Sequence, residues 1–353
     1  MAERILLITP QFYGVENEIQ SILLNQGYDV YWIENKNLAF DYHGTKSKFK
    51  LLRKVYFYIF SPPVRYLKKE LKKLQDLRFD ILFLINGFII CNYLFKKLRQ
   101  RNPLIRSILY LWDSSSMYSW KKELKYFDRV FTFDPLDSKT LGIEYKPNFY
   151  IEKSGKQAFS QSYDLSFAGK FSLDRLIAID RIIESVISSG VSFYVRVWAG
   201  KKMWFHNKVL YKFLKKININ GKWIYNYIIN FEAVNGLLKR DYIYTNNLGF
   251  QEMQRYMVSS NVILDLPFKY QAGYSHRLIG ALANGKKIIT SNLNIKNEFF
   301  FNPNQFRFID YEKPVIDFNW VKDIEEFTIP EVFTNLELSL WLTSFLHDEN
   351  SKY

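Results

Sequence analysis

The residues with the clearest chemical potential follow a short aliphatic run, VILD, that ends at Asp265. A glycine-bearing loop comes next, and Leu278, Ile279 and Leu282 then recur at helical spacing. In an α/β crossover of this kind, backbone N–H groups and the helix dipole favour a phosphate. Neighbouring histidine and arginine side chains would add donors. We predict a diphosphate site at Gly273, Tyr274, Ser275, His276 and Arg277. The alternative is an ordinary α/β crossover in which Arg277 faces solvent.

Polar side chains also follow several apolar runs of the N-terminal half, and the carboxyl ends of parallel strands share one edge of a sheet. Asp113 directly follows SILYLW, and Asp134 follows the next run. We predict Asp113 as a general base, with Asp134 as the alternative. Asp113 could equally cap a helix that starts near Ser115. The remaining rim residues, predicted to face a second ligand, are Phe12, Tyr13, Gly14, Asn86, Trp112 and Ser114.

The elements that must position these residues alternate between strand and helix, which predicts an α/β fold with two Rossmann-like, doubly wound domains. RILLIT at 4–9, a helix ending near Gly27 and YDVYWI begin the first domain. YDLSFAGK at 163–170 begins the second. The expected boundaries are 1–150, 160–312, and C-terminal helices over 313–353 that pack back on the first domain.

The segment 261–302 resembles the donor-binding signature of GT-B glycosyltransferases of bacterial capsule and lipopolysaccharide (exopolysaccharide) biosynthesis. Asp265, Gly273, Arg277, the Lys286-Lys287 turn and Asn292 carry this resemblance. Weaker support comes from 110–150 and 163–175. The resemblance implies two domains facing a cleft and a nucleotide-sugar donor. It also implies donor contacts from Gly169, Lys170, Arg175, Asp265 and Asn292. It further implies a lipid-linked or growing saccharide as acceptor, which would be the ligand of the rim residues in the first domain.

One departure from the family pattern and one missing motif bear on that resemblance. The family usually has a glutamate three residues after the arginine, where it holds the donor ribose, but this chain has Gly280. A non-catalytic nucleotide-sugar-binding subunit is therefore a further possibility. No DxD motif stands where a metal-dependent transferase would need it, so we expect no metal and no cofactor.

Net charge is the informative feature of the composition: 49 Lys and Arg against 35 Asp and Glu give +14. Residues 45–75 interleave ten of these cations with apolar and aromatic side chains, which suits the surface of an anionic membrane. The alternative is a helical hairpin with a solvated basic face. A nucleic-acid-binding protein is the rival function, but no nucleic-acid-binding motif accompanies the charge, so we expect no nucleic acid as a partner.

Three further features bear on where the protein works. Its single cysteine, Cys91, allows no internal disulfide. The N-terminal sequence lacks the pattern of a signal peptide, and no run of eighteen apolar residues could span a bilayer. We therefore expect a cytoplasmic protein, peripheral on the inner face of the cytoplasmic membrane.

Overall fold

The computed structural model describes residues 2–36, 62–86, 92–115, 124–152, 162–199, 236, 239–246, 249–268, 271–325 and 327–347. The chain divides into two compact units. Unit 1 comprises Met1–Phe149, Gln271–Tyr274 and Asn335–Tyr353, and unit 2 comprises Tyr150–Tyr270 and Ser275–Thr334.

Unit 1 is built on a parallel sheet of six strands in the order β2-β1-β3-β4-β5-β6. The chain runs outward in both directions from β1 and β3, so the order reverses between these two strands. The strands are β1 Arg4–Thr9, β2 Asp29–Glu34, β3 Ile81–Ile85, β4 Arg106–Leu111, β5 Arg129–Thr132 and β6 Glu144–Tyr145.

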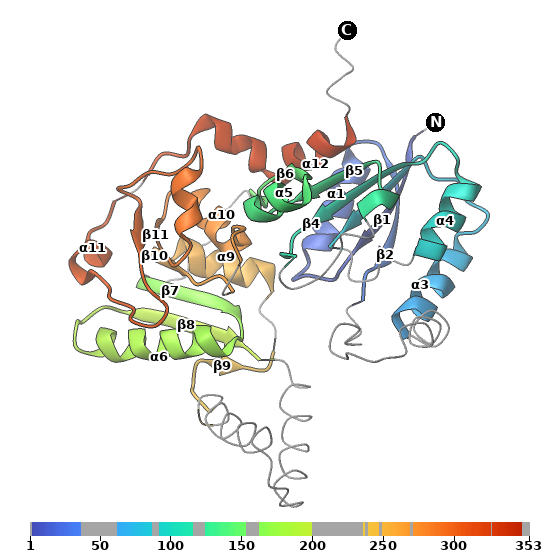
Figure 1. Cartoon of the computed structure of the whole chain (residues 1–353). Coiled ribbons are helices and arrows are strands. Elements are labelled where there is room, and N and C mark those ends of the chain that lie inside the picture. Colours follow the sequence, from blue (N-terminus) through green and yellow to red (C-terminus); the bar gives the residue numbers. More distant parts are fainter. Residues whose placement is uncertain are drawn as a thin grey trace, which may run out of the picture. The chain divides into compact units, whose positions relative to one another are not determined.

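Helices cover both faces of this sheet, and the alternation of side chains along each strand separates the two faces (Figure 1). Val64 and Leu67 of α3, with Phe95 and Leu98 of α4, pack on one face. Phe345 of α12 packs against Phe83 and Phe131 of the other. The helices are α1 Val15–Asn25, α3 Pro62–Lys73, α4 Asn92–Arg101, η1 Leu124–Tyr126, α5 Pro135–Leu141 and α12 Leu338–Leu346.

The last helix of the chain is a core element of unit 1. Trp341 is completely buried, donates from Nε1 to the Pro147 carbonyl oxygen at 3.0 Å, and contacts the rings of Tyr110 and Phe149. The expected boundary of this terminal segment, residue 313, differs from the observed one. Residues 313–334 belong to unit 2, because Ile316 and Val321 lie in its hydrophobic core.

Unit 2 contains a second parallel sheet of six strands, in the order β12-β11-β10-β7-β8-β9. The order reverses between β7 and β10, as in dinucleotide-binding Rossmann folds. The strands are β7 Tyr163–Lys170, β8 Phe193–Trp198, β9 Ile243–Tyr244, β10 Ser260–Asp265, β11 Lys287–Thr290 and β12 Phe306–Phe308. The predicted α/β class with two Rossmann-like sheets is confirmed.

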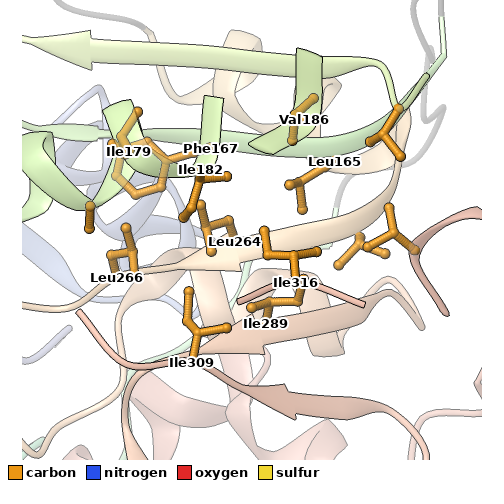
Figure 2. Packing of buried hydrophobic residues seen from close by; sticks show 14 of the residues in the cluster. Leu165, Phe167, Ile179, Ile182, Val186, Leu264, Leu266, Ile289, Ile309 and Ile316 are labelled. Carbon is orange, nitrogen blue, oxygen red and sulfur yellow. The ribbon is translucent and has the colours of Figure 1, made fainter. Parts of the chain in front are cut away.

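The core of unit 2 lies between its sheet and α6. Figure 2 shows Ile179, Ile182 and Val186 of α6 packed on Leu165 and Phe167 of β7, within a cluster that continues across the neighbouring strands. On β10, Val262 and Leu264 belong to this cluster. The helices of unit 2 are α6 Leu173–Ile187, α9 Phe250–Val258, α10 His276–Leu282, η2 Leu293–Asn297, α11 Phe318–Lys322 and η3 Glu331–Leu336.

Of the predicted membrane-binding segment 45–75, residues 45–61 lie outside the described part of the chain, as does Cys91. The rest forms α3 and the turn after it. No helix among the described residues combines the length and the apolar character needed to cross a bilayer.

Candidate functional site

The clearest cluster of charged side chains in unit 2 lies where its strand order reverses, at the carboxyl ends of β7 and β10. Arg277 donates from Nη2 to Asp265 Oδ1 at 2.9 Å and from Nη1 to the Ala168 carbonyl oxygen. Its guanidinium lies over the Phe167 ring, with 4.6 Å from Cζ to the ring centroid. The side chains of Arg277 and Asp265 are only 11% and 1% exposed. Two predicted residues, Arg277 of α10 and Asp265 of β10, thus meet beside β7.

Arg175 joins this cluster from the first turn of α6. Its Nε donates to the Leu266 carbonyl oxygen at 2.8 Å, Nη1 donates to the Lys170 carbonyl oxygen, and the guanidinium lies 4.5 Å from the Phe268 ring centroid. Burial, together with the positive charge of Arg277, lowers the pKa of Arg175 to about 10. The group still carries its proton at neutral pH.

The balance of charge in this cluster is positive. Asp265 pairs with Arg277 and interacts with the charge of Arg175, and its oxygens also accept from Ser275 Oγ at 2.7 Å and Thr290 Oγ1 at 3.2 Å. Two buried cations beside one buried anion favour the approach of a further anion. The Nε of Arg277 has no hydrogen-bond acceptor among the described residues. An anionic ligand could therefore be stabilised here.

Gly169 and Lys170 complete the carboxyl end of β7. A Cβ at Gly169 would lie 2.8 Å from Arg277 Nη1 and 3.0 Å from the Phe167 ring, so a side chain there would displace the arginine. Lys170 is exposed, with Nζ 5.9 Å from the Trp198 ring centroid. It is therefore the predicted donor residue best placed to reach a ligand directly.

Several other predicted donor residues hold the local fold together, as helix caps or through contacts within the protein. Ser275 is the N-cap of α10, and Asn292 is the N-cap of η2, with its Oδ1 accepting from Asn294 N at 3.1 Å. His276 is the first residue of α10, which has seven residues. Gly273 and Tyr274 belong to unit 1, where the Tyr274 carbonyl oxygen accepts from Asn148 Nδ2 at 2.8 Å. Gly273 and Tyr274 are close to Arg277 in the sequence, but this closeness did not indicate that they belong to the other unit.

Gly280, at the position where the resembling family has a glutamate, is a residue of α10 that faces α9. A Cβ at this position would meet Met257 Cε of α9 at 3.2 Å and its Sδ at 3.3 Å. Gly280 therefore allows α9 and α10 to pack closely, and no carboxylate reaches a ligand from this position.

Tyr311 was not predicted as part of the cluster around Arg175 and Arg277. Its hydroxyl donates to the Pro267 carbonyl oxygen, and burial raises its pKa.

In unit 1, unusual backbone geometry coincides with the reversal of strand order between β1 and β3. Among the described residues other than glycine, Tyr13 and Asn86 have positive φ, at 56° and 52°. Tyr13 follows the carboxyl end of β1, and Asn86 follows that of β3. Gly14, the residue after Tyr13, also has positive φ. Left-handed conformations in residues with side chains are costly and concentrate at functional positions.

Two predicted pairs meet at this edge. Asn86 Nδ2 donates to Asp113 Oδ2 at 2.6 Å, although the two residues are 27 positions apart. Phe12 and Trp112 contact each other, with ring centroids 5.2 Å apart. Ser114, which follows Asp113 in the sequence, is buried. Asp113 lies two residues after the end of β4 and is half-buried. It is therefore partly accessible, as a group that takes a proton from a ligand must be.

Asp134, the alternative base, is a buried helix cap. It is 1% exposed, its Oδ1 accepts from Leu136 N at 2.9 Å at the start of α5, and its Oδ2 accepts from Ala272 N at 3.1 Å. Both oxygens therefore have structural partners.

The sequence analysis missed Asp137, whose carboxylate accepts from Ser115 N at 2.6 Å and from Ser115 Oγ. Its spacing of three from a capping aspartate was the available signal.

The structure resembles solved structures along its whole length. An α,α-trehalose-phosphate synthase (UDP-forming) from Burkholderia vietnamiensis matches with a TM-score of 0.54 and 11% identity, covering 100% of this chain and 98% of that one. The N-terminal domain of trehalose-6-phosphate phosphatase from Candida albicans matches with a TM-score of 0.51 and 10% identity, covering 98% and 96%.

These likenesses confirm the expected GT-B fold. At such low identity they concern the fold alone. No protein-family model matches the sequence, and no curated protein matches it. Within the described residues, no three His, Cys, Asp or Glu side chains are grouped so that they could hold a metal ion.

Proposed function

We propose that this protein is a glycosyltransferase that uses a nucleotide-sugar donor, and that the donor diphosphate binds where β7 and β10 of unit 2 end. The observation that carries the proposal is the proximity of two cations, buried Arg175 and largely buried Arg277, to the single carboxylate of Asp265, which pairs with Arg277. A diphosphate would supply the missing negative charge. By analogy with other proteins of GT-B fold, we propose that a sugar is attached to that diphosphate.

Each cation has a distinct part in this proposal. Exposed Lys170 contacts a phosphate oxygen, whereas Arg175 and Arg277 act mainly through their charge, because their N–H groups are largely engaged with the protein. As the sugar leaves, negative charge grows on the diphosphate, and fixed cations in a site of low polarity stabilise that charge.

The acceptor is proposed to meet unit 1 near Asp113. The Asn86 amide fixes the orientation of the Asp113 carboxylate through Oδ2. In an inverting reaction Asp113 would take the proton of the acceptor hydroxyl. In a retaining reaction it would orient that hydroxyl instead. The aromatic pair Phe12 and Trp112 offers an apolar surface for a sugar ring.

For the acceptor we propose a lipid-linked or growing saccharide of capsule or lipopolysaccharide synthesis, assembled at the inner face of the cytoplasmic membrane. The net charge of +14 and the sequence resemblance described above support this proposal. An anionic surface attracts cationic side chains, and each nearby Lys or Arg adds about 1 kcal/mol to binding.

A panel of nucleotide sugars tests donor binding, by thermal shift and then by calorimetry, since a ligand of the folded state raises its stability. We expect one nucleotide sugar to bind, and Lys170→Gln to weaken it roughly tenfold or more, the effect of losing one charge-assisted hydrogen bond. Lys313→Gln is the matched control, because Lys313 is exposed in the same unit. Equal affinity in the two variants would contradict the assignment of Lys170.

Turnover with the identified donor separates an enzyme from a binding subunit. In a folded Asp113→Asn variant we expect a fall of roughly a hundredfold or more if Asp113 is the base, with donor affinity unchanged. Donor binding without turnover in the unaltered protein, across lipid-linked and saccharide acceptors, would identify a non-catalytic subunit. Failure of every nucleotide sugar to bind would overturn the proposed function.

A further inference from the structure

Unit 1 contains a pocket that the proposed sugar transfer does not use. It lies between α3 and α4 and has a cavity volume of about 220 Å³. Both helices approach the same face of the sheet (Figure 1). The lining residues are Lys68, Leu71, Lys72, Leu74, Gln75, Leu77, Phe79, Lys97, Leu98, Arg101 and Asn102.

The pocket is amphipathic. Its apolar lining comes from four leucines and Phe79, and its charged lining consists of Lys68, Lys72, Lys97 and Arg101, without an acidic member among the described lining residues. All four cations are exposed. The polar Asn102 is buried, and its amide is already used: Oδ1 accepts from Phe79 N and Nδ2 donates to the Leu98 carbonyl oxygen, both at 2.8 Å.

Helix stability explains only part of this charge. Lys72 lies in the last turn of α3 and Arg101 in the last turn of α4, where cations favour the helix dipole. Lys68 and Lys97 lie earlier in their helices, so the dipole does not account for them. Their convergence on one pocket, from two helices that are separate in sequence, points to a common anionic ligand.

The position of the pocket separates it from the predicted acceptor side. Residues 74–79 lead into the start of β3, and Arg101 and Asn102 lead toward the start of β4. The pocket is therefore at the amino edge of the sheet, whereas Asn86 and Asp113 follow the carboxyl ends of the same strands. A strand of this length spans about 16 Å. The pocket is also smaller than the roughly 300–1,000 Å³ usual for a whole ligand.

We propose that this pocket binds one phosphate-bearing amphiphile, with the phosphate among Lys68, Lys72, Lys97 and Arg101 and part of one hydrocarbon chain against the leucines and Phe79. Such a molecule is either a membrane phospholipid or an isoprenoid phosphate. The pocket anchors unit 1 to the amphiphile without presenting it for reaction. This inference rests on the proposed location at an anionic membrane, because Lys68 and Lys72 belong to segment 45–75. None of the pocket residues takes part in the proposed donor or acceptor site.

The test uses the full chain and monomeric short-chain phosphatidylglycerol, which has no membrane surface and so reports on the pocket alone. We expect saturable binding, and a loss of about fivefold for each pocket lysine removed, or about 25-fold in Lys68→Gln/Lys97→Gln. Lys69→Gln/Lys96→Gln is the matched control: both lysines are exposed on the same helices but do not line the pocket. Equal loss in both double variants would overturn the proposal.

Three further probes define the ligand. Short-chain phosphatidylcholine and glycerol phosphate should both bind much more weakly, since one lacks net negative charge and the other lacks the chain. If either compound bound as tightly as phosphatidylglycerol, the proposal of an anionic amphiphile as ligand would be wrong. Leu71→Trp, which fills the pocket and leaves its charge unchanged, should abolish binding while the unfolding transition is retained. Competition between the phosphatidylglycerol and a short-chain isoprenoid phosphate then identifies the source, since the preferred one displaces the other.

Discussion

Arg277 illustrates how one side chain can belong both to the fold and to a ligand site. Its ion pair with Asp265 and its contact with the Ala168 carbonyl oxygen hold β7 and β10 in a fixed relation to α10. Sequence resemblance led to the same arginine, but it implied a guanidinium that faces the donor. The contacts within the protein could not be foreseen, because they depend on which strands become neighbours in the sheet.

Asp137 leads to a prediction about pH. Its pKa is raised, first by burial, which outweighs the hydrogen bonds from Ser115, and Asp134 nearby adds to the increase. Between the unfolded pKa, near 3.8, and the higher folded pKa, the folded state binds the proton more tightly than the unfolded state does. The stabilisation from this group is fully present below the unfolded pKa and is lost as the pH rises through the folded pKa.

Replacement of this carboxyl should remove that pH dependence. We expect Asp137→Asn to gain stability relative to the unaltered protein as the pH rises from about 3.5 to about 6.5, because only the aspartate becomes charged while buried. Denaturant unfolding at a series of pH values measures the difference. A difference in the free energy of unfolding that stays constant across the series would show that Asp137 does not titrate abnormally.

At the scale of elements, periodicity and glycine positions located the strands and helices that carry the site. Aliphatic runs such as RILLIT and SILYLW have few structural alternatives, and the order of strand and helix implied parallel sheets. The loop between β10 and α10 was harder to interpret. Gly273 suggested a loop open to a phosphate, but the structure places it against the Phe133 ring of unit 1. Sequence patterns contain no information about such a distant neighbour.

The packing of this loop can be tested with a double-mutant cycle. A Cβ at Gly273 would lie 2.4 Å from Phe133 Cε2, and the ring is 1% exposed, so it has little room to move. We expect Gly273→Ala to lower the free energy of unfolding by about 1–3 kcal/mol, as overpacking usually does. In a Phe133→Leu background the same change should cost much less. Equal costs in both backgrounds would show that the ring does not confine the glycine.

At the scale of the whole molecule, the C-terminal helix α12 is as much a part of unit 1 as its strands are. We expect Trp341→Ala to lower the free energy of unfolding by about 3–5 kcal/mol, because it opens a cavity beneath β4 and removes the hydrogen bond to Pro147. Leu340→Ala on the same helix is the control, since Leu340 is 50% exposed and should change stability by far less. Guanidinium denaturation measures both, and similar losses would contradict the docking of α12 through Trp341.

The sequence analysis identified this terminal segment as a helix that could return to the first domain, but it placed the boundary too early. Residues 313–334 contain aromatic and aliphatic side chains that suit either unit equally well in composition. Only the packing of Ile316 and Val321 into the cluster around β7 and β10 assigns them to unit 2. Hydrophobicity alone specifies burial and leaves the partner open.

Unit 1 is composed of three separate pieces of chain, and this has a consequence for synthesis on the ribosome. Its six strands are complete by Tyr145, yet the residues that cover one face, Trp341 and Phe345, are translated about 200 residues later. At roughly 5–20 residues per second, this interval is about 10–40 s. During it, the newly made sheet exposes Phe83, Tyr110 and Phe131 to other nascent chains and to chaperones. Full protection of unit 1 must therefore await the synthesis of α12 and its emergence from the ribosome.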